Sequence, residues 1–364
     1  MKIIYGLLKI FPVKHKALYL SRQNNNIPED FILLSEEFAK ISPGIKNVYI
    51  CKTIGETYKE KFLYIFTILN MMRHLATAEY CFLDGYSIPV SVLKHKKRLI
   101  ISQIWHSLGA VKKFGHQSLD KPDARSGKTA KLMNMHKNYT FVFCASEATG
   151  DIYAEAFGAD REKVKILGFP RIDSILSDNN KIRDKILGRY PIFKEKANIF
   201  YCPTFRKDKI IDINKVANAF DHTKFNLIVK LHPLDKSSYD KAKAFTPPFS
   251  STELLTVADY VITDYSALCF EAALLNKPVF FYLYDYGDYI KERGLNIDPF
   301  AEFPIGASKN IEAISKIIEC GGYEKDEIIK FRNKYVTTAD CRNAERIIEF
   351  VASAGHRKDN LNNA

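Results

Sequence analysis

The alternation of short apolar runs with helical patterns, present in both halves of the chain, limits the possible folds most strongly. Apolar runs that alternate with amphipathic segments are typical of βαβ units, whose strands form a parallel sheet. The alternation continues through 364 residues, whereas one domain usually holds roughly 100–200 residues. The sequence therefore predicts an α/β protein with two doubly wound, parallel-sheet domains.

The expected strands are 17–20, 47–51, 80–83, 98–105, 140–145, 164–167, 198–202, 226–231, 260–263 and 278–282. The expected helices include 31–40, 58–75, 172–187, 252–258, 266–275, 311–319 and 325–354. Glycine and proline near residue 168 mark a join, so we expect domains at 1–168 and 169–364, with C-terminal helices able to pack back on the first domain. Ligands of doubly wound sheets bind at the carboxyl ends of strands, so we expect the site in a cleft between the domains.

Charge and cysteine usage narrow the class of protein. The net charge is +12, and residues 1–168 hold 25 Lys and Arg against 15 Asp and Glu. A basic half attracts anionic partners such as a membrane surface, a nucleic acid or a polyanionic substrate; a lysine-rich surface without a partner is the alternative.

The seven cysteines form no CxxC pair, which indicates reduced core residues rather than disulfides or a zinc site. No apolar run reaches the roughly 20 residues that span a bilayer.

The N-terminal segment 1–13 predicts a short amphipathic helix, with Lys2 and Lys9 beside its apolar residues. It lacks the long apolar stretch and cleavage site of a signal peptide. Such a helix either lies in a membrane interface or packs on its own domain. We favour the membrane interface, because the basic half of the chain follows it.

Polar residues follow several of the expected strands, where a doubly wound fold places its site. His106 comes after the strand at 98–105, with Ser107 next and Lys112 and Lys113 behind it. A histidine at this place is suited to act as a general base, although a single histidine is often structural.

Two further clusters follow strands of the second half. Thr204 and Arg206 come after the strand at 198–202, and an arginine suits bidentate phosphate binding. Lys230 and His232 end the strand at 226–231.

A fourth cluster runs into the helix expected at 266–275. Ser266 and the free N–H groups of the helix start predict an anion site for a phosphate, and a plain N-cap is the alternative. Asp264 and Ala267 flank Ser266, and Glu271 lies about one and a half turns into the helix, within possible reach of a ribose.

Together the clusters predict one site, with groups for a diphosphate on the second domain and a histidine on the first. The chain has no GxxxxGK[ST], GxGxxG, HExxH or GxSxG motif, so catalysis by positioning and electrostatics remains. We expect no redox cofactor and no essential metal.

The order of the motifs matches a known family. The motifs are Phe11–Lys14, Trp105–Leu108, Gly168–Asp173, Pro203–Arg206, Lys230–Pro233, Thr263–Ala267, Phe270-Glu271 and Lys277-Pro278, and Asp285, Tyr289, Arg293 and Gly294 also fit. Over nearly its whole length the chain resembles the CDP-glycerol glycerophosphotransferase family, the teichoic acid primases and polymerases. The resemblance implies a GT-B-like fold and transfer of a polyol phosphate, most simply glycerol phosphate, from a CDP-polyol to a hydroxyl, with release of CMP.

The resemblance also implies residue roles. His106 would be the base, His232, Arg206 and Ser266 would hold the diphosphate, and Glu271 would contact the ribose. Thr204, Lys230, Asp264 and Ala267 complete the expected donor side, and His232 is also assigned to catalysis. Ser107, Lys112 and Lys113 form the expected acceptor side.

The implied partners are CDP-glycerol or another CDP-polyol, a lipid-linked or polymeric anionic acceptor, and the membrane surface, without a nucleic acid. The implied location is peripheral, on the cytoplasmic face of a bacterial membrane, in synthesis of a teichoic acid or capsule-type polymer. The chain departs from the family pattern at Ser107-Leu108 (usually Gly-Thr), at Ala267 (usually Ser) and at Glu271 (usually Asp). A GT-B glycosyltransferase that uses a nucleotide sugar, and a non-catalytic polyanion- or membrane-binding protein, remain the alternatives.

Overall fold

The computed structural model describes residues 1–122, 124–177, 179–207, 210–232, 235, 237–241 and 243–363. Within these residues it contains a six-stranded and a five-stranded sheet, and all neighbouring strands of both sheets run parallel. The two expected parallel sheets are therefore confirmed.

The first sheet has the order β2-β1-β3-β4-β5-β6, and the second has the order β11-β10-β9-β7-β8. The strands are β1 (Lys16–Ser21), β2 (Lys46–Cys51), β3 (Tyr80–Leu83), β4 (Ile100–Gln103), β5 (Phe141–Cys144), β6 (Val164–Ile166), β7 (Ala197–Tyr201), β8 (Phe225–Val229), β9 (Tyr260–Thr263), β10 (Val279–Tyr282) and β11 (Ala307–Ser308).

The chain forms two compact units, one around each sheet. The first unit holds residues 1–108, 114–174 and 338–364, and the second holds 109–113 and 175–337. The division after residue 174 lies a few residues beyond the join expected at 168. Two segments do not belong to the same unit as the residues before them in the sequence. The C-terminal residues 338–364 belong to the first unit, and the short segment 109–113 belongs to the second.

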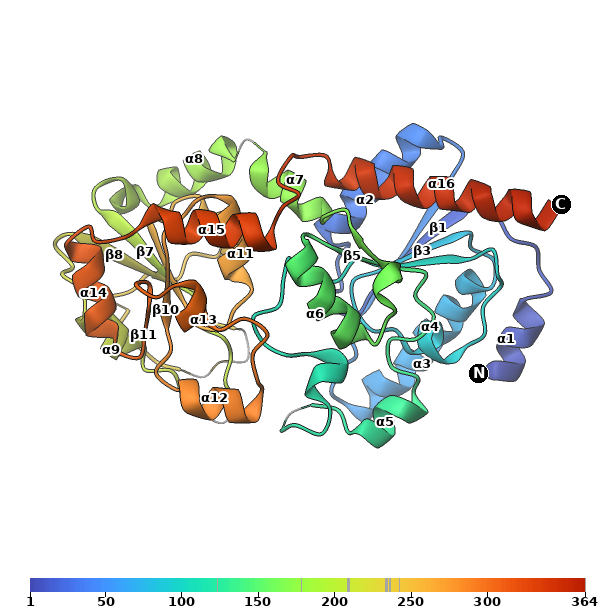
Figure 1. The fold of residues 1–364 in the computed structure, drawn as a ribbon, viewed down its shortest axis with the longest axis horizontal. Coiled ribbons are helices and arrows are strands. Elements are labelled where there is room, and N and C mark those ends of the chain that lie inside the picture. Colours follow the sequence, from blue (N-terminus) through green and yellow to red (C-terminus); the bar gives the residue numbers. More distant parts are fainter. Residues whose placement is uncertain are drawn as a thin grey trace. The chain divides into compact units, whose positions relative to one another are not determined.

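The helices cover the faces of each sheet (Figure 1). In the first unit they are α1 (Lys2–Leu8), α2 (Glu29–Ile41), α3 (Tyr58–Leu75), α4 (Ile88–Val92), α5 (Gly127–Leu132), α6 (Glu147–Phe157) and α16 (Asn343–Asn363), with α7 (Pro170–Leu176) at the division. In the second unit they are α8 (Asn180–Arg189), α9 (Ile213–Asn218), α10 (Ser251–Leu255), α11 (Leu268–Leu274), α12 (Tyr286–Glu292), α13 (Pro299–Glu302), α14 (Ile311–Glu319) and α15 (Lys325–Tyr335).

The core of the first unit lies between β1, β3 and the helices α2 and α16. Every residue of β1 is buried, as expected for a parallel strand covered on both faces. The buried residues Phe31, Leu34 and Phe38 recur at helical spacing, so α2 turns one apolar stripe towards the sheet. Helix α16 lies beside α2 (Figure 1), and Ile347 and Val351 join the same core.

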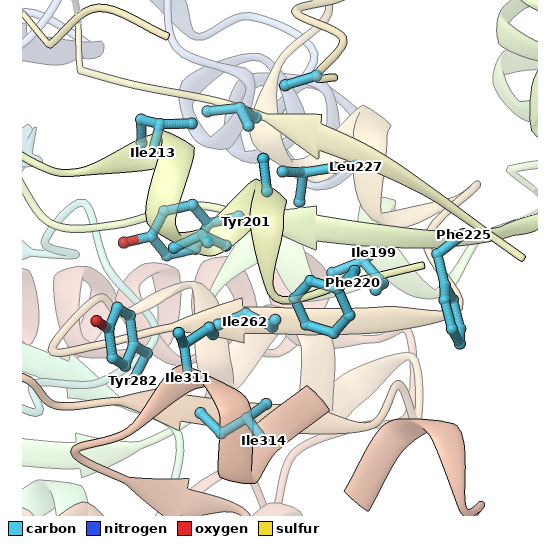
Figure 2. Close-up of a cluster of buried hydrophobic side chains, with 14 of the residues drawn as sticks. Ile199, Tyr201, Ile213, Phe220, Phe225, Leu227, Ile262, Tyr282, Ile311 and Ile314 are labelled. Carbon is cyan, nitrogen blue, oxygen red and sulfur yellow. The ribbon is translucent and has the colours of Figure 1, made fainter. Parts of the chain in front are cut away.

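The second unit has its own core on the face of the sheet that α9 and α14 cover (Figure 2). Figure 2 shows Ile199 and Leu227 from adjacent strands, and Ile213 and Ile314 from the two helices. Each of these side chains is almost fully buried. The apolar strands of the second half are thus explained by burial in a separate core.

Both sheets have a topological switch point, where successive connections leave a strand in opposite directions. In the first sheet β2 and β3 flank β1, and in the second sheet β8 and β9 flank β7. Loops at the carboxyl ends of such strand pairs form the binding crevices of doubly wound folds.

Two expected helices are interrupted. The helix expected at 172–187 is divided into α7 and α8, and the helix expected at 325–354 into α15 and α16. Ser177 and Asn179, at the first break, belong to the residue types that compete with helical hydrogen bonds through their side chains. At the second break Cys341 has a φ of 57°, a left-handed conformation that ends a helical path.

In the described part of the chain, no helix combines the length and the apolar character that crossing a membrane requires.

Candidate active site

His106 lies in the loop that follows β4, at the carboxyl end of the first sheet. Its Nδ1 is 2.8 Å from the carbonyl oxygen of Asp84. A carbonyl oxygen only accepts hydrogen bonds, so Nδ1 carries the proton in this contact, and the neutral ring keeps its lone pair on Nε2. This tautomer is the one that a general base needs.

The backbone beside His106 has an unusual conformation. Trp105 has a φ of 53°, in the left-handed region that residues with a Cβ rarely adopt, and its ring centroid is 4.1 Å from that of His106. Backbone conformations of this kind persist where the surroundings impose them, and they are frequent at functional sites.

Arg171, from the Gly168–Asp173 motif, holds the backbone of His106. Its Nη1 donates to the carbonyl oxygen of His106 at 2.8 Å. Its Nε and backbone N–H donate to the carboxylate of Asp30, at 2.9 and 2.8 Å, and Asp30 is buried in the first turn of α2. Since Arg171 is fixed by a buried carboxylate, it acts as a positioning residue for the loop that carries His106.

The same motif also anchors α16. The carboxylate of Asp173 accepts hydrogen bonds from the backbone N–H groups of Asn343 and Ala344, at 3.0 and 2.8 Å. Gly168 has a φ of 80°, and a Cβ there would come within 1.6 Å of Asn343 Oδ1. The glycine and the aspartate of the motif are therefore explained by the close approach of α16.

Asp84 contributes a buried carboxyl group beside His106. Its Oδ2 accepts a hydrogen bond from Ser21 Oγ at 2.6 Å, whereas its buried Oδ1 has no hydrogen-bond partner among the described residues. Burial is the main cause that raises the pKa of Asp84 to about 6. Asp30 also acts to raise it, while the hydrogen bond from Ser21 and the charge of Arg171 oppose the shift. Asp84 was not among the expected site residues, although it directly follows the strand expected at 80–83.

In the second unit, Thr204 and Asp264 connect the two strand ends at the switch point. The backbone N–H of Thr204 lies 2.9 and 3.0 Å from the two carboxylate oxygens of Asp264, which is buried. The hydroxyl of Thr204 is buried without a hydrogen-bond partner in the described part of the chain. A buried polar group in this state needs an explanation, and a bound ligand is one.

Arg206 lies inside the second unit with 8% of its surface exposed. Its Nε and Nη2 donate to the carboxylate of Asp285 at 2.8 and 3.2 Å, and Nη2 also donates to Asp264 at 3.1 Å. Its Nη1 donates to the carbonyl oxygen of Thr204 at 2.7 Å. Burial alone lowers the pKa of Arg206, but Asp264 and Asp285 more than offset this and keep it charged.

Two stacked tyrosine rings complete the surroundings of Arg206. The centroids of Tyr265 and Tyr289 are 3.7 Å apart, and the guanidinium carbon lies 5.3 and 4.6 Å from them. The sequence analysis expects Arg206 to hold a diphosphate. Its guanidinium contacts carboxylates, a carbonyl oxygen and aromatic rings of the same unit, and the diphosphate contact stays a prediction.

The segment 109–113 pairs with residues 294–297 of the second unit. The backbone N–H of Lys113 donates to the carbonyl oxygen of Gly294 at 3.1 Å, and Asn296 Nδ2 donates to the carbonyl oxygen of Lys112 at 3.2 Å. Both lysines were expected on the acceptor side, with the first domain. The structure places them in the same compact unit as the expected donor residues.

The ammonium of Lys112 lies among charged groups of that unit. Burial lowers the pKa of Lys112; Asp264 raises it, while Arg206 and Arg293 lower it further. Asp264, the carboxylate that raises the pKa of Lys112, also accepts a hydrogen bond from Arg206.

Lys230 and His232 follow β8, as expected. Lys230 Nζ donates to the carbonyl oxygen of Phe249 at 2.6 Å, and the ring of His232 lies beside that of Phe205, with centroids 5.1 Å apart. Pro233, the last residue of this motif, is outside the described residues. The structure therefore brings His232 next to the loop that contains Thr204 and Arg206.

The remaining expected donor residues lie at the start of α11. The hydroxyl of Ser266 accepts from the backbone N–H of Leu268 at 3.3 Å, and Ala267 is the N-cap residue without a side-chain hydrogen bond. Glu271 accepts a hydrogen bond from Thr252 Oγ1 at 2.8 Å. The Ser266 contact fits a helix start, and the phosphate site expected there stays a prediction.

Ser107, from the expected acceptor side, lies in the first unit, where its carbonyl oxygen accepts from the hydroxyl of Tyr153 at 2.8 Å. The described residues contain no group of three or more His, Cys, Asp or Glu side chains arranged to hold a metal ion.

The profile of one protein family matches residues 4–353, and that family is described as CDP-glycerol:poly(glycerophosphate) glycerophosphotransferase. The chain belongs to this family. Membership in the glycerophosphotransferase family confirms the resemblance and the class of enzyme that the motifs indicate.

Curated relatives from this family cover most of the chain. The teichoic acid ribitol-phosphate primase of Bacillus spizizenii is 29% identical over 96% of this chain and 94% of its own length. The poly(ribitol-phosphate) polymerase of the same organism is also 29% identical, but the match covers 58% of its length. The teichoic acid glycerol-phosphate primase of Bacillus subtilis is 27% identical over 88% of this chain and 84% of its own length.

Solved structures confirm the fold of this glycerophosphotransferase family member. The wall teichoic acid polymerase TagF superposes with a TM-score of 0.75 at 17% identity, covering 98% of this chain and 93% of that one. A UDP-GlcNAc 2-epimerase from Neisseria meningitidis superposes with a TM-score of 0.60 at 13% identity, covering 93% and 99%. The expected GT-B-like arrangement of two Rossmann-type sheets is therefore confirmed.

Proposed function

We propose that the protein transfers a polyol phosphate from a CDP-polyol to a hydroxyl of a lipid-linked or polymeric acceptor, with release of CMP, in teichoic acid or capsule-type polymer synthesis. The observation that carries the proposal is the tautomer of His106, whose Nδ1–H···O contact with Asp84 makes Nε2 the basic nitrogen of the neutral ring. Family membership supplies the donor class.

The proposed step balances with one base and one leaving group. Nε2 of His106 takes the proton of the acceptor hydroxyl, and the oxygen attacks the phosphorus that bears the polyol. A new phosphorus–oxygen bond forms while the bond between that phosphorus and the bridging oxygen of CMP breaks. CMP leaves with the electron pair, and its charge needs cationic or N–H neutralisation.

The donor phosphates are assigned to groups of the second unit. Lys112 and Arg293 bring positive charge, the Thr204 hydroxyl is buried without a partner among the described residues, and His232 lies beside the same loop. Arg206 acts through the shape of this loop, because its guanidinium contacts Asp264, Asp285 and Thr204. Lys112, which was expected to face the acceptor, is thus proposed to bind the donor.

A panel of donors tests the proposed function. CMP release is measured with CDP-glycerol, CDP-ribitol and several nucleotide sugars, with crude membrane lipid as acceptor. The motifs favour glycerol phosphate, whereas the names of the relatives specify ribitol phosphate in some cases and glycerol phosphate in others, so the panel also decides the polyol. CMP release from a CDP-polyol is the expected result. Turnover of a nucleotide sugar alone would replace the proposal with a GT-B glycosyltransferase.

We also propose that transfer requires no metal ion, because Lys112, Arg293 and N–H donors provide the neutralising charge. Treatment with EDTA followed by gel filtration should leave the rate of CMP release unchanged. Loss of activity that Mg²⁺ restores would overturn this part of the proposal.

Peripheral attachment to the cytoplasmic face of the membrane completes the proposal. Tyr5 OH, on α1, is 2.7 Å from His95 Nδ1, so one face of α1 packs on the first unit. The opposite face of α1 exposes apolar residues. Helix α3, which contacts α1, also exposes apolar residues. The exposed apolar side chains of the two segments are Ile3, Ile4, Leu7, Ile10, Phe11, Tyr58, Phe62, Leu63, Ile65, Phe66 and Leu69. Together with neighbouring lysines they suit an anionic lipid surface.

Vesicle flotation tests this attachment. The double variants Ile3→Ser/Leu7→Ser and Phe62→Ser/Phe66→Ser should each reduce co-flotation with phosphatidylglycerol vesicles. Ile210→Ser, which changes a 75% exposed apolar residue of the second unit, is the control and should float like the unaltered protein. Undiminished flotation of both double variants would place the attachment elsewhere.

A further inference from the structure

Two arginines flank one tyrosine ring at the switch point of the first sheet. Arg22 is the first residue after β1, and Tyr86 is in the loop after β3. The guanidinium carbons of Arg22 and Arg125 lie 5.8 and 4.8 Å from the centroid of the Tyr86 ring. The ring therefore holds two positive charges close together through cation–π contacts.

No carboxylate of the described residues forms an ion pair with either arginine. The side chain of Arg22 donates one hydrogen bond, from Nη1 to the carbonyl oxygen of Tyr86 at 2.9 Å, and its Nε is buried without a partner in the described structure. The buried hydroxyl of Ser87, next to Tyr86, has no hydrogen-bond partner among the described residues either. Unsatisfied donors beside paired positive charges indicate a place for an anion.

The charges of the two arginines also affect each other. Burial lowers the pKa of Arg22, and the guanidinium of Arg125 lowers it further, against the opposite effects of Tyr64, Tyr86 and Asp84. A bound anion would relieve this repulsion.

One short loop connects the arginine pair to the base. The carbonyl oxygen of Asp84 accepts from His106 Nδ1, and the carbonyl oxygen of Tyr86 accepts from Arg22 Nη1. Residues 84–86 thus hold His106 and Arg22 at the same edge of the sheet, where doubly wound folds bind ligands.

We propose that Arg22 and Arg125 form a phosphate-binding subsite for the acceptor, which therefore carries a phosphate ester near the hydroxyl that His106 deprotonates. The planar, permanently charged guanidinium groups suit the oxygens of a phosphate monoester or diester. The assignment to the acceptor rests on the proposed function, whereas the binding of a phosphate ester does not.

Direct binding is measured with glycerol 3-phosphate as the probe and glycerol as the neutral control. Trp105 is the single tryptophan of the chain, and its ring lies beside that of His106, so its fluorescence reports on this edge of the sheet. Arg22→Gln and Arg125→Gln should each weaken the binding of glycerol 3-phosphate at least about tenfold, a loss of one charge-assisted contact. Arg161→Gln is the matched control, because Asp151 and Glu147 already pair with that arginine in the same unit.

Kinetics and flotation identify the source of the phosphate. In Arg22→Gln/Arg125→Gln the KM for the acceptor should rise about tenfold or more while the KM for the CDP-polyol and vesicle flotation stay unchanged. Unaltered glycerol 3-phosphate binding in the double variant would overturn the inference. Loss of flotation with retained glycerol 3-phosphate binding would assign the arginines to lipid headgroups and also overturn it. Binding of glycerol 3-phosphate by a protein that releases no CMP from any CDP-polyol would overturn the proposed function alone.

Discussion

The switch points of the two sheets use the same residue types for different purposes. Each has an arginine and a buried aspartate in the loops after adjacent strands: Arg22 and Asp84 in the first sheet, Arg206 and Asp264 in the second. Arg206 donates to two carboxylates, whereas Arg22 has no ion pair among the described residues. Carboxylates thus engage the guanidinium of Arg206, whereas the guanidinium of Arg22 contacts a carbonyl oxygen and a tyrosine ring among the described residues, which is why we propose a ligand role for Arg22.

The largest expected effect follows from replacing the proposed base. His106→Gln removes the proton acceptor and should lower the rate of transfer by about 10²–10⁴-fold, with little change in the KM for the donor, because the donor groups lie in the second unit. The measurement is CMP release under saturating donor. His222→Gln is the control, since His222 also bonds a backbone carbonyl but lies in the second unit. A fully active His106→Gln would remove the base assignment.

The next prediction concerns the two arginines themselves. Arg206→Gln leaves Asp264 and Asp285 buried without their cation and should reduce the free energy of unfolding by about 3–5 kcal/mol. Arg22→Gln leaves no carboxylate unpaired and should cost about 1 kcal/mol or less. Denaturant unfolding followed by circular dichroism measures both. Equal losses in the two variants would contradict the distinction between them.

The buried carboxyl of Asp84 leads to a prediction about pH. The pKa of Asp84 is raised to about 6 in the folded protein, above its ordinary value of 3.8, so the folded state keeps the proton to higher pH than the unfolded state. Stability from this group therefore falls as pH rises from about 4 to about 6.

Asp84→Asn abolishes that titration, so the variant should gain about 2–3 kcal/mol of stability near pH 7 relative to pH 4, compared with the unaltered protein. Thermal unfolding at a series of pH values measures the difference. Asp160→Asn, which changes an exposed carboxylate paired with Lys163, is the control. A difference curve for Asp84→Asn that is flat between pH 4 and 7 would contradict the raised pKa of the buried Asp84 carboxyl.

The smallest expected effect tests the positioning of the base. Arg171→Lys removes the guanidinium group, which bonds both Asp30 and the carbonyl oxygen of His106. It should lower kcat about tenfold, with the KM for the donor unchanged. Chemical rescue by added guanidinium in Arg171→Ala provides a readout that a general loss of stability does not give. Arg161→Lys, at an exposed pair, should keep its kcat.

The sequence predicted the two sheets and the location of His106 because strand burial and strand-end polarity are local patterns. Helix α3 has the bounds that were expected, and in the structure a capping box of Thr57 and Glu60 begins it. The crossing of segment 109–113 into the second unit was not predictable, because its pairing with residues 294–297 joins parts far apart in the sequence. For the same reason Lys112 and Lys113 were expected in the first domain.

Which groups contact an arginine depends on the fold, and this explains why the contacts of Arg206 and Arg125 could not be predicted from the sequence. Arg206 has a motif position that suggests phosphate binding, but Asp285 approaches it only when β10 lies beside β9. Arg22 and Asp84 follow predicted strands and could have been found by the same strand-end rule. Arg125 could not, because its proximity to Tyr86 depends on the path of a loop.

The central claim is that the switch point of the second sheet binds the donor and that of the first sheet binds the phosphate of the acceptor. Hydrogen exchange of the full-length protein tests this claim most directly. Amide exchange is followed by mass spectrometry with CMP and, separately, with glycerol 3-phosphate. We predict that CMP slows exchange in peptides covering 202–206 and 264–268, and that glycerol 3-phosphate slows it in peptides covering 22–25 and 84–87. Two results would contradict the account. In one, CMP but not glycerol 3-phosphate protects the loops of the first sheet. In the other, both compounds protect the loops of the second sheet and neither protects those of the first.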